Sequence, residues 1–165
     1  HDIYVNNTPY NWKKLGGKDE ELVPYCRNND SGSHTQMEKF ILDGNEINED
    51  IRRERTSYIM SSILTDVEKF NNENSDKYAM GYSLFYYYTK NSNMVFLNLK
   101  LLSVDGIEPT EKSIANGSYP YTTNYYAVIR DEDNPKVEAF AKLMQGEFGQ
   151  EIIRRSGMGV IKNTD

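Results

Sequence analysis

The chain has 165 residues, of which 38% are hydrophobic, and it carries a formal net charge of -6 at pH 7. This length suits one globular domain with a sizeable core, and the acidic balance argues against nucleic acid or an anionic membrane as a partner, because both are bound by basic faces. The single Cys26 excludes an intrachain disulfide, and the sequence has no Cys/His cluster with the spacing of a structural zinc site. We therefore expect no metal and no cofactor, and any anion site must be local.

The first predicted elements lead toward a polar loop. Residues 11–17 indicate a short helical turn stopped by glycine, and the apolar run 22–25 suits a buried strand because it lacks a helical period. That strand would deliver Arg27 at its C-terminal end. Strand, polar loop and helix, in this order, are typical of a ligand site in an α/β protein.

A helix is predicted to begin at Ser33. Its apolar residues have the spacing i, i+3, i+4, and Gly44 marks its end; these residues are Met37, Phe40 and Ile41. Ser33 and Gln36 also match a capping box, in which each side chain bonds to the backbone N–H of the other residue. The charged stretch 46–55 is mixed in sign and predicts a solvated surface segment or linker.

Further helices and strands are predicted in the rest of the chain. An amphipathic helix is expected from Tyr58 to Phe70, followed by a polar loop at 71–76 and an aromatic helix from Tyr82 to Tyr88. The later elements are a strand over 95–104 with a turn at 105–106, a short helix over 110–114, and a strand over 121–129. A last helix opens at Asn134 and Pro135, is broken at Gly146 and continues over 148–155.

The stretch from Arg27 to Ser33 has the composition of an oxyanion site. Arg27 offers a fixed fork of N–H donors, and Ser31 and Ser33 offer hydroxyls. Gly32 lets backbone N–H groups approach a ligand without an intervening side chain. Taken by itself, the same stretch also fits a helix cap beside a surface arginine, so the residues alone leave both interpretations open.

Several short motifs follow one another along nearly the whole chain. They are Asn11-Trp12-Lys13-x-Leu15-Gly16-Gly17, Arg27-x-x-x-Ser31-Gly32-Ser33, Gly81-Tyr82-Ser83, Leu101-Leu102-Ser103-Val104-Asp105-Gly106-Ile107-x-Pro109-Thr110, Gly117-Ser118-Tyr119-Pro120 and Phe148-Gly149-Gln150-Glu151-Ile152-Ile153. Their order resembles that of the substrate-binding proteins of bacterial high-affinity phosphate ABC transporters. No single motif would suffice for this resemblance.

The resemblance implies an α/β fold, the periplasmic-binding-protein-like type II lobe, with a central mixed sheet flanked by helices. In that family an Arg, followed four residues later by Ser-Gly-Thr or Ser-Gly-Ser, lines the second lobe's side of the anion cleft. Here these ligand-binding positions are held by Arg27, Ser31, Gly32 and Ser33. Asp30 would repel an anion, so we expect it to point away, toward the N–H groups at the helix start.

The resemblance also implies how the chain is organised. We expect one substrate-binding-protein-like domain over residues 1–165, with the second lobe over about residues 1–117 and the returning strand and C-terminal helices over about 118–165. The segment that builds most of the first lobe in that family, with the carboxylate that accepts a proton from hydrogen phosphate, is missing from this sequence. One Arg and three neutral donors would give a phosphate dissociation constant of about 1 mM before association costs, so we expect the chain by itself to bind phosphate weakly or not at all.

The function implied is that of a non-catalytic component of an ABC transporter. It binds an oxyanion, foremost phosphate, and passes it to the membrane permease, as a monomer outside the cell or in the periplasm, lipid-anchored in the full-length protein. The alternative is a sensory or protein-interaction module that keeps the fold without tight anion binding. An enzyme is disfavoured, because the neighbours Ser33 and His34 cannot pair as nucleophile and base without a special turn, and no orienting acid is evident.

Overall fold

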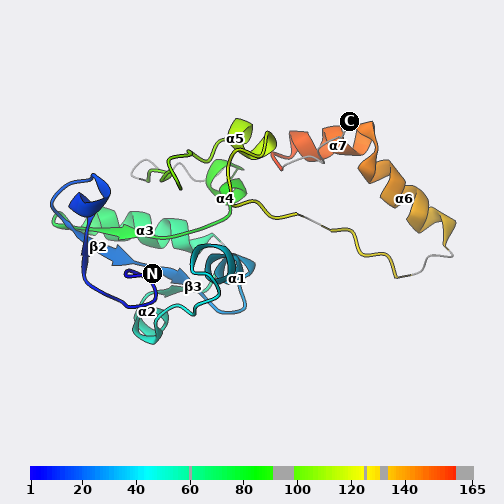
Figure 1. Cartoon of the computed structure of the whole chain (residues 1–165). Coiled ribbons are helices and arrows are strands. Elements are labelled where there is room, and N and C mark those ends of the chain that lie inside the picture. The colour runs from blue at the N-terminus through cyan, green and yellow to red at the C-terminus, as the bar shows by residue number, and fades with distance from the viewer. Residues whose placement is uncertain (60, 91–98, 125, 131–133, 159–165) are drawn as a thin grey trace. The chain divides into compact units, whose positions relative to one another are not determined.

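The computed structural model describes residues 1–59, 61–90, 99–124, 126–130 and 134–158. The chain divides into two compact units, residues 1–100 and residues 101–165. The first unit is α/β, with small sheets flanked by helices, which confirms the predicted fold class (Figure 1). Within the described ranges, no helix has the length and apolar character needed to cross a membrane.

The first unit is built from short strands and helices. Its strands are β1 (Tyr10–Asn11), β2 (Glu21–Pro24), β3 (Cys26–Arg27), β4 (Thr56–Ser57) and β5 (Lys77–Met80). Its helices are the 3-10 helix η1 (Trp12–Leu15), α1 (Gly32–Gln36), the π-helix η2 (Met37–Ile41), α2 (Glu49–Glu54), α3 (Ser62–Glu73) and α4 (Phe85–Lys90). One sheet has the order β1-β2-β5, with β2 antiparallel to β1 and parallel to β5, and the other sheet pairs β3 with β4 in parallel.

The second unit contains helices in its described residues. They are α5 (Glu111–Ala115), α6 (Pro135–Gln145) and α7 (Glu147–Arg155). The predicted starts of two of them are confirmed. Thr110 caps α5 through its side chain, and the Asn134 side chain caps α6, with Pro135 at the first helical position.

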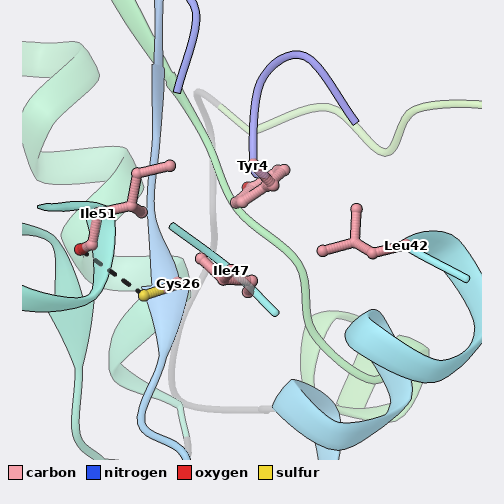
Figure 2. Close-up of a cluster of buried hydrophobic side chains, with 5 residues drawn as sticks. All are labelled: Tyr4, Cys26, Leu42, Ile47 and Ile51. Atoms are coloured by element: carbon pink, nitrogen blue, oxygen red, sulfur yellow. Dashed lines mark hydrogen bonds between the residues drawn. The ribbon is translucent and has the colours of Figure 1, made fainter. Parts of the chain in front are cut away.

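One hydrophobic core joins the N-terminal turn to β3 and α2. Its buried side chains, drawn in Figure 2, are Tyr4, Cys26, Leu42, Ile47 and Ile51. The Tyr4 hydroxyl lies 3.1 Å from the Tyr25 carbonyl oxygen and 3.2 Å from that of Met80, so it bridges backbone that precedes β3 and backbone that ends β5. A second core packs α3 against β5 through Ile63, Val67 and Ala79.

The charged stretch 46–55 forms part of the core, so the prediction of a solvated segment or linker is wrong. Ile47 is 1% exposed, and Ile51, which lies in α2, is fully buried. The acidic and basic residues around them face outward and are mostly exposed. Because α2 makes fewer than two turns, it buries one apolar residue and shows no helical periodicity.

The helix after the polar loop begins earlier than predicted. Its N-cap residue is Ser31 rather than Ser33, and neither residue's side chain caps the helix, so the capping box of Ser33 and Gln36 is wrong. The helix continues from α1 into the π-helix η2, whose wider turn shifts the residues that follow. As a result Leu42 is buried, whereas Ile41 is 37% exposed.

Two strand predictions fail over the residues that the structure describes. Residues 121–124 and 126–129 form no strand, and Val128 is 91% exposed, because aromatic and β-branched residues make a strand only where a partner strand accepts their hydrogen bonds. Residues 99–103 are also not in a strand, while residues 95–98 lie outside the described part of the chain. Tyr58 and Ile59 precede α3 and are exposed, so that helix begins later than predicted, and it extends to Glu73, into the predicted polar loop 71–76.

The joint between α6 and α7 depends on Gly149. A Cβ added there would lie 2.4 Å from the Leu143 carbonyl oxygen and 2.4 Å from the Met144 Cα, both backbone atoms. We expect Gly149→Ala to destabilise this helix pair by about 1–3 kcal/mol, because the joint must open to admit the methyl group. Thermal unfolding followed by circular dichroism measures the effect, with Gln145→Ala at an exposed position as the control. An equal midpoint for the two variants would contradict the close packing.

Candidate anion-binding site

The candidate site lies where the parallel strands β3 and β4 end. Arg27 is in register with Ser57, and the backbone N–H of Asn28 donates to the Ser57 carbonyl at 3.3 Å. The chain then turns, with the N–H of Ser31 donating to the Asn28 carbonyl at 2.9 Å, and α1 begins at Gly32. The predicted order of strand, polar loop and helix is therefore confirmed, with Arg27 in its own strand, β3, after β2.

Arg27 is almost completely buried without a counterion. Its residue is 5% exposed, and its Nε donates to the Ser31 Oγ at 3.3 Å. The Nη1 atom is buried and has no hydrogen-bond partner among the described residues, and none of their carboxylates forms an ion pair with this side chain. A buried guanidinium with no counterion and an unpaired nitrogen is costly, so this group fits an anionic ligand better than a helix cap beside a surface arginine.

The two serines bring further donors to the same place. Their hydroxyl oxygens, Ser31 Oγ and Ser33 Oγ, lie 2.8 Å apart. Within the described residues, the backbone N–H groups of Gly32 and Ser33 have no acceptor, as expected for the first turn of a helix. A Cβ added at Gly32 would meet nothing within 4 Å, so the approach to this turn is open. The structure thus brings together all four predicted residues.

The neighbouring acidic residue, Asp30, makes no hydrogen bond to the site among the described residues. Asp30 is exposed, and within the described chain its side chain makes no hydrogen bond, including none to the N–H groups at the start of α1. The expected bond to the helix start is therefore wrong. The exposed carboxylate is solvated instead, which lowers its effect on an anion bound at Arg27.

Three residues that the sequence did not predict at the site, Tyr82, His34 and Glu38, form hydrogen bonds next to it. The Tyr82 hydroxyl accepts a hydrogen bond from the backbone N–H of Arg27 at 3.0 Å and lies 3.2 Å from the His34 Nδ1. The His34 Nε2 lies 3.0 Å from the Glu38 Oε1. Burial raises the pKa of the Tyr82 hydroxyl well above its usual range, so it keeps its proton. Periodicity assigned Tyr82 to an aromatic helix and gave no signal for a buried His34.

A separate polar contact and a cavity lie beside α3. The Ser57 Oγ donates to the Asp66 Oδ2 at 2.5 Å, which fixes β4 to the helix. Asp66 also lines a cavity of about 310 Å³ together with Tyr25 and Phe70 among other residues, but none of the four predicted site residues lines it. The candidate anion site is therefore distinct from this cavity. In the described residues, His, Cys, Asp and Glu form no cluster of three or more suited to a metal ion.

Comparison with known proteins connects this geometry to a family. The chain is 30% identical over 155 residues to the phosphate-binding protein PstS of Bacillus subtilis (strain 168), a match that covers 94% of this chain and 46% of that protein. It is 26% identical over 162 residues to the phosphate-binding protein PstS of Borreliella burgdorferi, covering 96% of this chain and 55% of that protein. The chain thus spans about half the length of the curated relatives it matches.

A solved structure and a family model agree with these matches. The fold resembles that of a Clostridium perfringens protein assigned to the phosphate ABC transporter substrate-binding proteins and solved with bound phosphate, with a TM-score of 0.68. That match has 24% identity and covers 98% of this chain and 60% of that chain, so it shows a shared fold. Residues 2–147 match the model of the PBP superfamily domain. The chain therefore belongs to the PBP superfamily, with the type II periplasmic-binding-protein-like α/β fold.

Proposed function

We propose that this chain is the anion-binding part of a phosphate-binding protein of an ABC transporter, and that it binds without catalysis. The observation that carries the proposal is the buried Arg27 guanidinium, which has no counterion among the described residues and lies beside two serine hydroxyls. The similarity to two PstS proteins supports phosphate as the anion.

The proposed binding mode uses donors from one turn of the chain. Arg27 supplies the charge through Nη1, Ser31 and Ser33 supply hydroxyls, and the N–H groups of Gly32 and Ser33 supply the start of the helix. Arg27 and the two N–H groups can only donate, and the set contains no carboxylate to accept the proton of hydrogen phosphate. An acceptor for that proton would come from the other lobe of a two-lobed protein, and closure of the two lobes would raise the affinity.

The same proposal includes a role for the chain in transport. The chain would present phosphate to the membrane permease of the transporter, outside the cytoplasmic membrane, as a monomer anchored by lipid in the full-length protein. In this role residues of about 1–117 would form the second lobe and about 118–165 the return of the chain. A sensory or interaction module is the competing function, and it would keep the fold without a response to phosphate.

Titration of the chain with inorganic phosphate, followed by two-dimensional NMR of backbone amides, tests the proposal. We expect a dissociation constant on the order of 1 mM, with the largest shifts at the amides of Gly32 and Ser33. Sodium chloride at matched ionic strength is the control for screening. Shifts spread evenly over the surface would favour the interaction module, and micromolar affinity would contradict the assignment of half a site to this chain.

A further inference from the structure

A line of hydrogen bonds runs inward from the backbone of Arg27. The Arg27 N–H donates to the Tyr82 hydroxyl at 3.0 Å, and the same hydroxyl lies 3.2 Å from the His34 Nδ1. On the other side of the ring, the His34 Nε2 lies 3.0 Å from the Glu38 Oε1, which also accepts from the backbone N–H of Ile47 at 3.0 Å. His34 is 3% exposed, so its ring nitrogens depend on these partners.

The proton positions along this line follow from which groups can donate. The Tyr82 oxygen already accepts from Arg27, so its own proton is free to go to the His34 Nδ1. His34 then carries its proton on Nε2 and donates it to the Glu38 carboxylate. The opposite tautomer would place a nitrogen lone pair against the carboxylate and leave the buried Tyr82 proton without an acceptor. Of the two neutral tautomers, only the Nε2–H form gives every group a partner.

The line links the anion site to three different parts of the chain. Arg27 ends β3, His34 and Glu38 lie one helical turn apart on the helix that begins at the site, and Tyr82 follows β5. Tyr82 is also held by the ring of Tyr4, with centroids 5.8 Å apart in an edge-on arrangement. The ring of Tyr82 is therefore held by Tyr4, and its hydroxyl by Arg27 and His34. Because the backbone of Arg27 bonds to it, the start of the Arg27 side chain is fixed as well.

We propose that His34 and Tyr82 are positioning residues for anion binding, with Glu38 setting the tautomer of His34. This inference rests on the proposed function, because it gives these residues a role in holding Arg27 toward phosphate. His34 directs the Tyr82 proton away from Arg27, so the hydroxyl oxygen stays available as an acceptor. The Arg27 N–H is then held in one direction, and the guanidinium is held where it meets the hydroxyl of Ser31.

Matched variants of His34 separate positioning from packing. In Asn the amide oxygen occupies the place of Nδ1 and can accept from Tyr82, whereas in Gln the amide nitrogen occupies the place of Nε2 and can donate only to Glu38. Both variants lose the ring and its packing. We expect the phosphate dissociation constant to rise at least about fivefold for His34→Gln and for Tyr82→Phe, and about twofold or less for His34→Asn.

The experiment measures phosphate titrations by NMR for the wild-type chain, these three variants and Tyr126→Phe, whose ring is 80% exposed, as the control. In the wild-type chain, nitrogen-15 spectra of the imidazole are expected to show the neutral Nε2–H tautomer. The Arg27 amide proton is expected to move upfield in Tyr82→Phe and to stay in place in Tyr126→Phe. The His34 tautomer is measured in the wild-type chain, so it decides the direction of the hydrogen bond between Tyr82 and His34 even where a variant fails to fold.

The outcomes separate this inference from the function it rests on. A wild-type chain with no phosphate response contradicts the proposed function, and the positioning role falls with it. A wild-type response that Tyr82→Phe leaves unchanged, or equal losses for His34→Asn and His34→Gln, overturns the positioning role alone. A protonated His34 or an Nδ1–H tautomer would also overturn it, because the Tyr82 proton would then point elsewhere.

Discussion

Phosphate is expected to stabilise the wild-type chain against unfolding and to lose about half of this effect or more in Arg27→Ala. Arg27 supplies the charge at the site, and a hydrogen bond to a charged group contributes about 1.5–3 kcal/mol, equivalent to a roughly 10- to 100-fold weaker dissociation constant once it is lost. With a dissociation constant of about 1 mM, about 100 mM phosphate would add about 2.7 kcal/mol to the free energy of unfolding. In Arg27→Ala the gain falls to about 1.4 kcal/mol or less.

Stability without phosphate separates a binding role of Arg27 from a structural one. Removal of the side chain breaks the bond from its Nε to Ser31, but it also removes a buried charge that lacks a partner in the described residues. These effects oppose each other, so we expect the free energy of unfolding in chloride to change by less than about 1 kcal/mol. Arg53→Ala, at an exposed arginine paired with Asp50 and Glu54, is the control. Equal phosphate stabilisation of the Arg27→Ala and wild-type proteins would exclude Arg27 from the site.

Truncation of Ile51 is expected to destabilise the first unit more than any other change considered. Its side chain is fully buried among Tyr4, Cys26 and Ile47, and it holds α2 against β3 (Figure 2). Ile→Ala at such a position costs about 2–5 kcal/mol, from lost burial and from the cavity that remains. Urea unfolding should show a lower midpoint with an unchanged slope, because the surface exposed on unfolding is nearly the same.

Ile59→Ala is the matched control for this truncation. Ile59 is 71% exposed, so the same chemical change is expected to alter the free energy of unfolding by less than about 0.5 kcal/mol. The difference between the two variants therefore measures mainly burial, since the higher helix propensity of Ala at position 51 is a smaller effect of opposite sign. Equal midpoints would mean that α2 does not pack on the core as described.

The predictable part of the fold is the part that local chemistry determines. Gly16 ends η1 with a φ of 82°, and Asn134 with Pro135 opens α6, both as expected from residue type. The location of α2 could not be predicted in this way, because Ile47 and Ile51 stand alone among charged residues and are buried by contacts with distant segments. The expected strand over 121–129 fails for the opposite reason, since suitable residue types do not supply a partner strand.

The same division applies to the site. The proximity of Arg27, Ser31 and Ser33 follows from one loop, so their spacing in sequence was enough to predict that they would meet. Tyr82 reaches Arg27 across 55 residues, and no local pattern reports such a contact. His34 is polar and yet buried, and hydrophobic periodicity predicts a surface position for a polar residue.

Because Arg27 and Tyr82 are far apart along the chain, the hydrogen bond between them can form only late in synthesis. When residues 27–33 leave the ribosome, the N–H of Arg27 has no hydroxyl to bond to, and it stays so until 55 more residues have been added. The hydrogen bond of the Tyr4 hydroxyl spans a still longer stretch of chain, because one of its two acceptors is the carbonyl of Met80, 76 residues away. A nascent chain that stops before this point carries Arg27, Ser31 and Ser33 but lacks the Tyr82 hydroxyl that accepts from the Arg27 N–H. The segment 80–82 therefore supplies, within three residues, both the Met80 carbonyl that accepts from the Tyr4 hydroxyl and the Tyr82 hydroxyl that accepts from the Arg27 N–H.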